Sequence, residues 1–298
     1  MVTGTPAHPI TRPAPENGAD LGVAISGVQN RTAAEGGGNR GPLVIALHGG
    51  TYSSAYFDIP GHSLLERADE QGIPVIALDR PAYGASTMLE PSDSIIASNA
   101  LVVSDVIGRI WEEWSDRASG IVIIAHSIGG AIATDIAANR PSWPLLGIAV
   151  SGCLLDVPPE SAKAWQELPD IPLIDLPTQV KDSVMFGPEG SYDSEMPAAS
   201  HPSNTPVPRA ELIDITSTWI ERVREVASRV AVPVHSRQAE FDALWITDAQ
   251  QVADFAAAFV NSPRVDAALV PGSGHCIDFH TAGAGFQAEQ LAFVKSLA

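Results

Sequence analysis

The chain has 298 residues, 45% hydrophobic and 17% charged, which is enough for one large α/β domain or a core domain with an insertion. Its 17 basic and 35 acidic residues give a formal net charge of −18, so nucleic acid and anionic membrane surfaces are poor partners. The sequence contains no apolar run long enough to span a membrane. The two cysteines do not make a disulfide framework, and the scattered histidines lack metal-ligand spacing, so we expect neither metal nor cofactor.

Residues 1–19 are proline-rich and lack the apolar core of a signal peptide. We therefore expect a flexible arm and, by default, a cytoplasmic protein. Two continuous apolar runs follow, 42–47 and 73–78, which are typical of strands buried on both faces of a sheet. Each leads into a polar turn, 48–51 and 79–84. A long amphipathic helix is expected next, capped by Ser92 or Asp93.

The stretch 121–131 has an unusual order of residue types. Five apolar residues lead into His126 and Ser127, and two glycines and a helix-forming segment follow. This order predicts a strand, a tight turn and a helix, with Ser127 at the apex beside free backbone N–H groups. Acyl transfer requires such an exposed hydroxyl next to N–H donors. Ala125 stands where the usual G-x-S-x-G motif has its first glycine, so an ordinary turn that contains a serine is the alternative.

Strands and helices alternate up to about residue 151, which predicts an α/β fold with a mostly parallel sheet and helices on both faces. The proline-rich segment 156–230 breaks this rhythm, although it ends in a predicted helix over 209–230. We interpret 156–230 as a lid with helical and irregular parts, the alternative being a partly disordered linker. The alternation then resumes, so the predicted core comprises 20–155 and 231–298.

Two further polar residues follow the last strands of this predicted sheet. Asp242 comes after the penultimate strand, and His275 lies in a glycine-containing turn after the final one. A serine hydroxyl needs a base to become a nucleophile, and the base needs an orienting acid. The strand ends of a parallel sheet meet at one edge, where such sheets bind ligands. Ser127, Asp242 and His275 are therefore expected at a common site.

With these pieces in this order, the chain resembles the α/β-hydrolase superfamily, in the branch with a lid inserted after the sixth strand. The matching pieces are His48-Gly49-Gly50, Asp79-Arg80-Pro81-Ala82-Tyr83-Gly84, Ala125-His126-Ser127-Ile128-Gly129-Gly130, Ala239-Glu240-Phe241-Asp242 and Gly274-His275. The resemblance implies that Ser127 is the nucleophile, His275 the general base and Asp242 its orienting acid. It implies an oxyanion hole made by the N–H of Ile128 and that of Gly50 or Thr51.

Several assignments stay open at this stage. Glu240 is an alternative acid, because a two-residue shift keeps both side chains on one strand face, and Asp156 is another. Other residues are candidates for substrate binding: Tyr52, Tyr56 and Phe57 after the oxyanion turn, and Met185 and Phe186 in the lid. The three aromatic residues after the turn could instead pack beneath the lid.

The expected function is hydrolysis of a carboxylic ester, lactone or related acyl bond in a fairly apolar small molecule, through an acyl-enzyme. The same three residues could cleave a C–C, amide or thioester bond. A non-catalytic ligand-binding protein of the same fold is a third hypothesis, since fold alone does not decide function. The sequence makes no prediction of oligomeric state.

Overall fold

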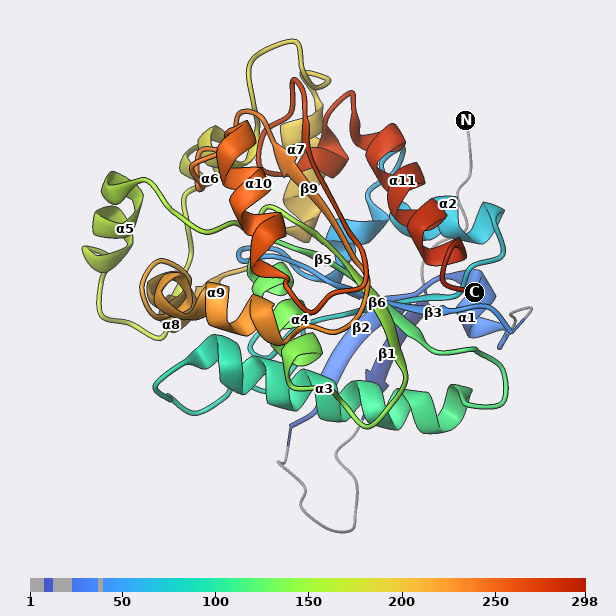
Figure 1. The fold of residues 1–298 in the computed structure, drawn as a ribbon. Coiled ribbons are helices and arrows are strands. Elements are labelled where there is room, and N and C mark those ends of the chain that lie inside the picture. Colours follow the sequence, from blue (N-terminus) through green and yellow to red (C-terminus); the bar gives the residue numbers. More distant parts are fainter. Residues whose placement is uncertain (1–7, 13–22, 37–39) are drawn as a thin grey trace.

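The structure is a computed structural model, and it describes residues 8–12, 23–36 and 40–298. Within these residues, eight strands form one sheet in the order β1-β2-β4-β3-β5-β6-β9-β10, with helices on both faces (Figure 1). The strands are β1 (His8–Arg12), β2 (Ile25–Gln29), β3 (Leu43–Leu47), β4 (Val75–Leu78), β5 (Ile121–His126), β6 (Leu145–Ser151), β9 (Val234–Ala239) and β10 (Val265–Val270). All neighbouring pairs from β4 to β10 are parallel, which confirms the predicted α/β fold with a mostly parallel sheet.

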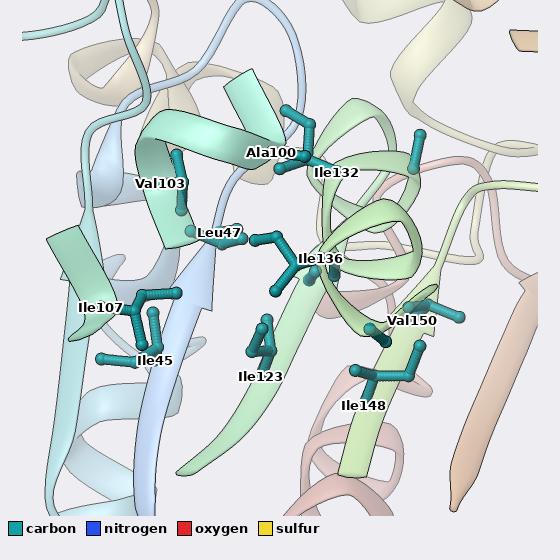
Figure 2. Close-up of a cluster of buried hydrophobic side chains, with 14 of the residues drawn as sticks. Ile45, Leu47, Ala100, Val103, Ile107, Ile123, Ile132, Ile136, Ile148 and Val150 are labelled. Atoms are coloured by element: carbon teal, nitrogen blue, oxygen red, sulfur yellow. The ribbon is translucent and has the colours of Figure 1, made fainter. Parts of the chain in front are cut away.

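The central strands are apolar on both faces because helices cover both sides of the sheet. In β3, Leu43, Ile45 and Leu47 face one hydrophobic cluster, while Val44 and Ala46 face the other. This alternation is the two-residue period of a strand. Figure 2 shows the first cluster, where side chains of β3, β5 and β6 interdigitate with those of the covering helices; its labelled residues are Ile45, Leu47, Ala100, Val103, Ile107, Ile123, Ile132, Ile136, Ile148 and Val150.

The helices divide between the two faces. The first face carries α3 (Ile95–Trp114), α4 (Ile128–Ala138), α9 (Thr218–Arg229) and α10 (Ala249–Ala258). The second carries α2 (Leu64–Glu70) and α11 (Gly283–Lys295), with the short η1 (Ser54–Asp58) and η3 (Ile277–Phe279) between sheet and surface. The cap of α3 is Ser94, which accepts a hydrogen bond from the N–H of Ala97, so the expected caps Ser92 and Asp93 were one or two residues early.

Segment 156–230 consists of short helices and strands joined by irregular loops, and it lies along the left side and top of the molecule in Figure 1. Its elements before α9 are α5 (Pro159–Gln166), β7 (Leu173–Ile174), α6 (Thr178–Met185), α7 (Met196–Ser200), η2 (His201–Ser203), β8 (Val207–Pro208) and α8 (Arg209–Ile215). The single helix predicted over 209–230 is broken, because Thr216 and Ser217 return hydrogen bonds from their hydroxyls to the carbonyl oxygens of the preceding turn. Helix α9 then packs on α4 of the core rather than over the site.

Two details near the N-terminus differ from expectation. Residues His8–Arg12, inside the predicted flexible arm, form the edge strand β1 and pair antiparallel with β2, while the other residues of 1–19 lie outside the described residues. The stretch 30–41 is rich in glycine and asparagine, a composition that predicts a loop, yet it contains the short helix α1 (Arg31–Ala34), capped by Asn30. Among the described residues, no helix combines the length and apolar character needed to cross a membrane.

Candidate active site

Ser127 occupies a strained turn between β5 and α4. Its φ of 55° and ψ of −125° lie in a region that non-glycine residues rarely adopt. The turn is held by the N–H of Ser127, which donates to the carbonyl oxygen of Ser151 at 2.7 Å. A Cβ on Gly129 would lie 2.4 Å from the carbonyl oxygen of Leu47, so the close approach of α4 to β3 requires glycine there. Ala125 is fully enclosed in β5, where its methyl group is accommodated.

Three predicted residues from three strand ends form one hydrogen-bonded chain. The Nε2 atom of His275 lies 3.0 Å from the Oγ of Ser127. On the opposite side of the ring, Nδ1 lies 2.7 Å from Oδ2 of Asp242. The other carboxylate oxygen of Asp242 accepts from the N–H of Leu244 at 2.9 Å, which fixes the carboxylate plane. All three side chains are buried, so the hydrogen bonds between them are shielded from bulk water.

The turn between β3 and η1 lies against this serine. A Cβ placed on Gly49 would be 2.8 Å from the Cβ of Ser127, which shows how closely the turn approaches it. The carbonyl oxygens of His48 and Gly49 accept from the Arg80 guanidinium at 2.8 and 3.0 Å. These bonds orient the turn's carbonyl groups, and across a trans peptide each N–H points opposite to the carbonyl it is joined to. Thr51 has a φ of 64°, a second strained position in the turn.

A small cavity of about 40 Å³ opens onto Ser127. Its lining contains no charged side chain and comprises Gly50, Thr51, Ser127, Ile128, Val157, Trp165, Leu176, Met185, Leu212, Ile215, Thr216, Leu244 and Trp245. The Oγ1 atom of Thr51 is buried and finds no hydrogen-bond partner within the described part of the chain. At about 40 Å³ this space is far smaller than the roughly 300 Å³ or more of an ordinary ligand pocket, and seven of its lining residues come from segment 156–230.

Comparison with known proteins identifies the family. The model of the alpha/beta hydrolase family matches residues 44–286, well over half of the chain. The chain belongs to the alpha/beta hydrolase family. The AB hydrolase superfamily protein YfhM of Bacillus subtilis is 30% identical over 168 residues, 52% of each chain. Protein phosphatase methylesterase 1 of Homo sapiens is 29% identical over 120 residues, which are 40% of this chain and 28% of that protein.

Solved structures share the fold over nearly the whole chain. A structure described as a thermophilic esterase has a TM-score of 0.64 at 17% identity and covers 98% of this chain and 99% of its own. A putative aryl esterase from Burkholderia cenocepacia has a TM-score of 0.66 at 17% identity, covering 97% and 99%. At such identities the likeness describes the fold of this alpha/beta hydrolase. The chain spans about half or less of the curated relatives it matches.

The structure separates the predicted binding residues of this alpha/beta hydrolase into two groups. Met185 lies on the cavity wall with Gly50, Thr51 and Ile128, as expected. Phe186 does not, because its ring packs against Tyr192, Phe279 and His280.

The aromatic residues after the oxyanion turn also need a correction. Tyr52, Tyr56 and Phe57 are buried in the hydrophobic cluster of the second face and are absent from the cavity lining. Tyr56 stacks on His126 and donates to Asp278 at 2.7 Å. The turn into η1 directs these rings beneath the site, where they support it instead of lining it.

The two alternative acids lie away from the hydrogen-bonded chain. Glu240 is exposed, and its Oε2 accepts from the N–H of Gly272 at 2.9 Å. Asp156 accepts from the side-chain amide of Gln251 at 2.9 Å. Neither contacts His275, so the geometry favours Asp242 as the residue that orients the imidazole.

Two histidines beside the site are held neutral. Burial lowers the pKa of His48 well below its ordinary value, and the Arg80 cation lowers it further. Burial also lowers the pKa of His126, with His275 and His48 as additional causes. Cys276, directly after His275, is buried with a pKa raised to about 12, so its thiol stays protonated. Across the described residues, no group of three or more His, Cys, Asp or Glu side chains could hold a metal ion.

Sequence reasoning missed several residues at this site. Lys181 of α6 is buried, and Glu211 of α8 forms a fully buried ion pair with Arg80 at 2.5 Å. The hydroxyl of Tyr83 also donates to Glu211 at 2.7 Å. Arg80 and Glu211 are 131 residues apart. Local periodicity carries no signal for such a pair.

Proposed function

We propose that this alpha/beta hydrolase is a serine hydrolase that cleaves a carboxylic ester, or a related acyl bond such as a lactone, in a small apolar molecule. The single observation that supports this most is the hydrogen-bonded chain from Asp242 through His275 to Ser127, which opens onto a cavity without charged walls. The esterases among the structural neighbours and the match to methylesterases agree with ester hydrolysis.

The proposed reaction begins at Ser127. His275 Nε2 accepts the hydroxyl proton while Oγ forms a bond to the acyl carbon, and the carbonyl electron pair moves onto the oxygen. Asp242 holds the Nδ1 proton of His275 and stabilises the imidazolium that forms. The N–H of Ile128 and that of Gly50 or Thr51 stabilise the developing oxyanion. Collapse expels the alcohol, which takes the proton from His275 and leaves an acyl group on Ser127.

A water molecule then repeats the sequence. His275 accepts its proton as the oxygen attacks the acyl carbon, and the second tetrahedral intermediate releases the carboxylic acid and restores the Ser127 hydroxyl. Every proton in this scheme moves between the substrate, water, Ser127 and His275. The scheme needs no group beyond the substrate and water.

The apolar lining supports an uncharged acyl chain as the group next to the serine. Trp165, Leu176 and Leu212 come from the lid, and Leu244 and Trp245 come from the loop after β9. Burying an unpaired charged group among these apolar side chains costs on the order of several kcal/mol, so anionic acyl groups are disfavoured. The formal charge of −18 acts in the same direction.

Activity-based labelling tests this proposal. A fluorophosphonate probe forms a covalent bond to an activated serine, so wild-type protein is expected to be labelled at Ser127, and Ser127→Ala is expected to be inert. Folded wild-type protein that resists the probe and does not turn over esters contradicts the proposal and favours a ligand-binding protein. A panel of p-nitrophenyl esters of increasing chain length, with lactones, thioesters, amides and a diketone, then identifies the bond that is cleaved.

A further inference from the structure

In the oxyanion turn, residues 48–51, the carbonyl oxygens of His48, Gly49 and Thr51 accept hydrogen bonds from groups of the lid or from Arg80, which is paired with the lid. All of these lid groups lie within residues 156–217, the part of the lid that precedes α9. The Nζ of Lys181, on α6, donates to the carbonyl oxygen of Thr51 at 2.8 Å. The same oxygen accepts from the N–H of Thr205 at 3.0 Å. Two lid segments therefore meet on one peptide of the turn.

Lys181 is held in place by several contacts. Its Nζ also donates to the side-chain oxygen of Asn204, and it lies 3.2 Å from the centroid of the Tyr52 ring. The protonated form is attracted by the ring quadrupole, while burial lowers the pKa of Lys181 to about 7. The side chain is 2% exposed. Backbone bonds continue the connection, because Ser53 N–H donates to the carbonyl oxygen of Ser203 at 2.9 Å.

The other end of the turn is connected to the lid through Arg80. Its guanidinium donates to the carbonyl oxygens of His48 and Gly49 and forms the buried pair with Glu211 of α8. The bond to the Gly49 carbonyl fixes the peptide that carries the Gly50 N–H. A buried guanidinium needs a counter-charge, because removing one partner of a buried pair is costly. The orientation of the Gly50 N–H therefore depends on a lid glutamate.

These contacts act on a turn that must be accurate. A hydrogen-bond donor in an oxyanion hole is worth about 10²–10³ in kcat, and its effect depends on its distance from the oxyanion. The cavity beside Ser127 measures about 40 Å³, well below the roughly 300 Å³ or more of a ligand pocket, so a substrate enters when the lid residues on its wall move. Movement of α6 or α8 alters the bonds on Thr51, or those made by Arg80, at the same time.

We propose that Lys181 and Glu211 are positioning residues that make the geometry of the oxyanion turn depend on lid closure. Lys181 acts on the turn directly through the Thr51 carbonyl, and Glu211 acts through Arg80 on the Gly49–Gly50 peptide. The inference rests on the proposed function, because it concerns the stabilisation of an oxyanion formed at Ser127. Closure of the lid then covers the substrate and completes the oxyanion hole in one motion.

Paired ketone inhibitors separate this role from a general effect on the lid. An aryl trifluoromethyl ketone adds the Ser127 oxygen and places an oxyanion in the hole, whereas the matched methyl ketone binds without forming one. In Lys181→Met and Glu211→Gln, the inhibition constant of the trifluoromethyl ketone is expected to rise about 10- to 100-fold. That of the methyl ketone should change less than about twofold, kcat should fall, and KM should stay near its wild-type value.

Matched variants provide the controls. Lys163→Met makes the same substitution at an exposed lid lysine, and Asp135→Asn makes a similar change at the buried partner of Arg222; neither contacts the turn. Both should leave the ketone ratio unchanged. Lys181→Arg keeps a cationic donor and should recover most of the lost affinity. If Lys181→Met does not fold, Asn204→Ala removes only the acceptor that orients Nζ and is expected to show a smaller shift in the same direction.

The possible results lead to distinct conclusions. If the inhibition constants of both ketones rise equally, or neither changes, the positioning role is overturned. Labelling of Ser127 by the fluorophosphonate in the same experiments still supports the proposed function. Wild-type protein that is neither labelled nor inhibited by the trifluoromethyl ketone overturns the proposed function and this inference together. Selective loss of affinity for the trifluoromethyl ketone in Lys181→Met and Glu211→Gln, with recovery in Lys181→Arg, supports the positioning role.

Discussion

The ring of His126 lies against the ring of His275, with centroids 4.7 Å apart. The His126 ring also stacks on Tyr56, with centroids 5.0 Å apart, and its Nδ1 lies 3.2 Å from the Oγ of Ser151. Since burial and the neighbouring histidines keep the pKa of His126 low, the ring stays neutral when His275 takes a proton. A neutral neighbour supports the His275 imidazole without opposing its positive charge.

This relationship predicts different results for two substitutions of His126. His126→Phe keeps a neutral ring, so kcat is expected to stay within about tenfold of wild type. His126→Ala removes the support, and loss of a buried ring of this size typically costs about 3 kcal/mol of stability. Steady-state kinetics with thermal unfolding of both variants measures the two effects. Full loss of turnover in folded His126→Phe contradicts a supporting role and indicates that His126 exchanges protons.

Gly49 offers a test of how closely the oxyanion turn must approach the serine. A Cβ there would lie 2.8 Å from the Cβ and 3.4 Å from the Oγ of Ser127. A displacement near 1 Å at a reacting group can cost about 10² in rate, so Gly49→Ala is expected to lower kcat/KM by about that factor. Gly285→Ala on α11 is the control, because no atom lies within 4 Å of the added methyl group. Equal activity of the two variants contradicts the close packing.

The sequence predicted the meeting of Ser127, Asp242 and His275 because each follows a predicted strand, and parallel strands end at one edge. The positions of the lid residues depend on long-range contacts instead. Lys181 and Glu211 are placed by long-range pairing with Thr51 and Arg80, and such pairs leave no periodic pattern in the chain.

The aromatic residues show a second limit of sequence reasoning. Tyr52 and Tyr56 carry rings that suit a binding pocket or a core equally well. The direction of the chain into η1 decides between the pocket and the core, and it places both rings in the core. Residue type alone could not settle that direction.

The orienting acid can be identified by comparing two conservative variants. Asp242→Asn keeps the shape of the side chain but favours the wrong tautomer of His275, and the corresponding change in a known triad lowers kcat by about 10⁴. Glu240→Gln alters only the exposed contact with the Gly272 N–H, so less than about a twofold change is expected. Measurement of kcat for both on one ester decides the matter. A larger loss in Glu240→Gln is the result that assigns the acid to Glu240.

The lowered pKa of His235 predicts how the stability of the protein depends on pH. Burial, together with Arg237, lowers this pKa to about 4, whereas a histidine in an unfolded chain has a pKa of about 6.5. Between these values the unfolded state binds more protons, so His235 contributes stability above pH 6.5 that is lost as the pH falls toward 4. The slope is at most about 1.4 kcal/mol per pH unit. His235→Phe should flatten the fall in Tm over this window, and parallel curves contradict the assignment.

Leu212 tests whether the small cavity receives the acyl chain. It lies on α8 and lines the same cavity as Ser127, with 6% of its surface exposed. Leu212→Ala makes room for two or three more carbons, and one methylene in an apolar pocket changes discrimination by about tenfold or more. The ratio of kcat/KM for p-nitrophenyl hexanoate to that for the acetate is therefore expected to rise about tenfold. Ile171→Ala removes an exposed apolar lid residue outside the cavity and should leave the ratio unchanged. An unchanged ratio in folded Leu212→Ala shows that the acyl chain lies elsewhere.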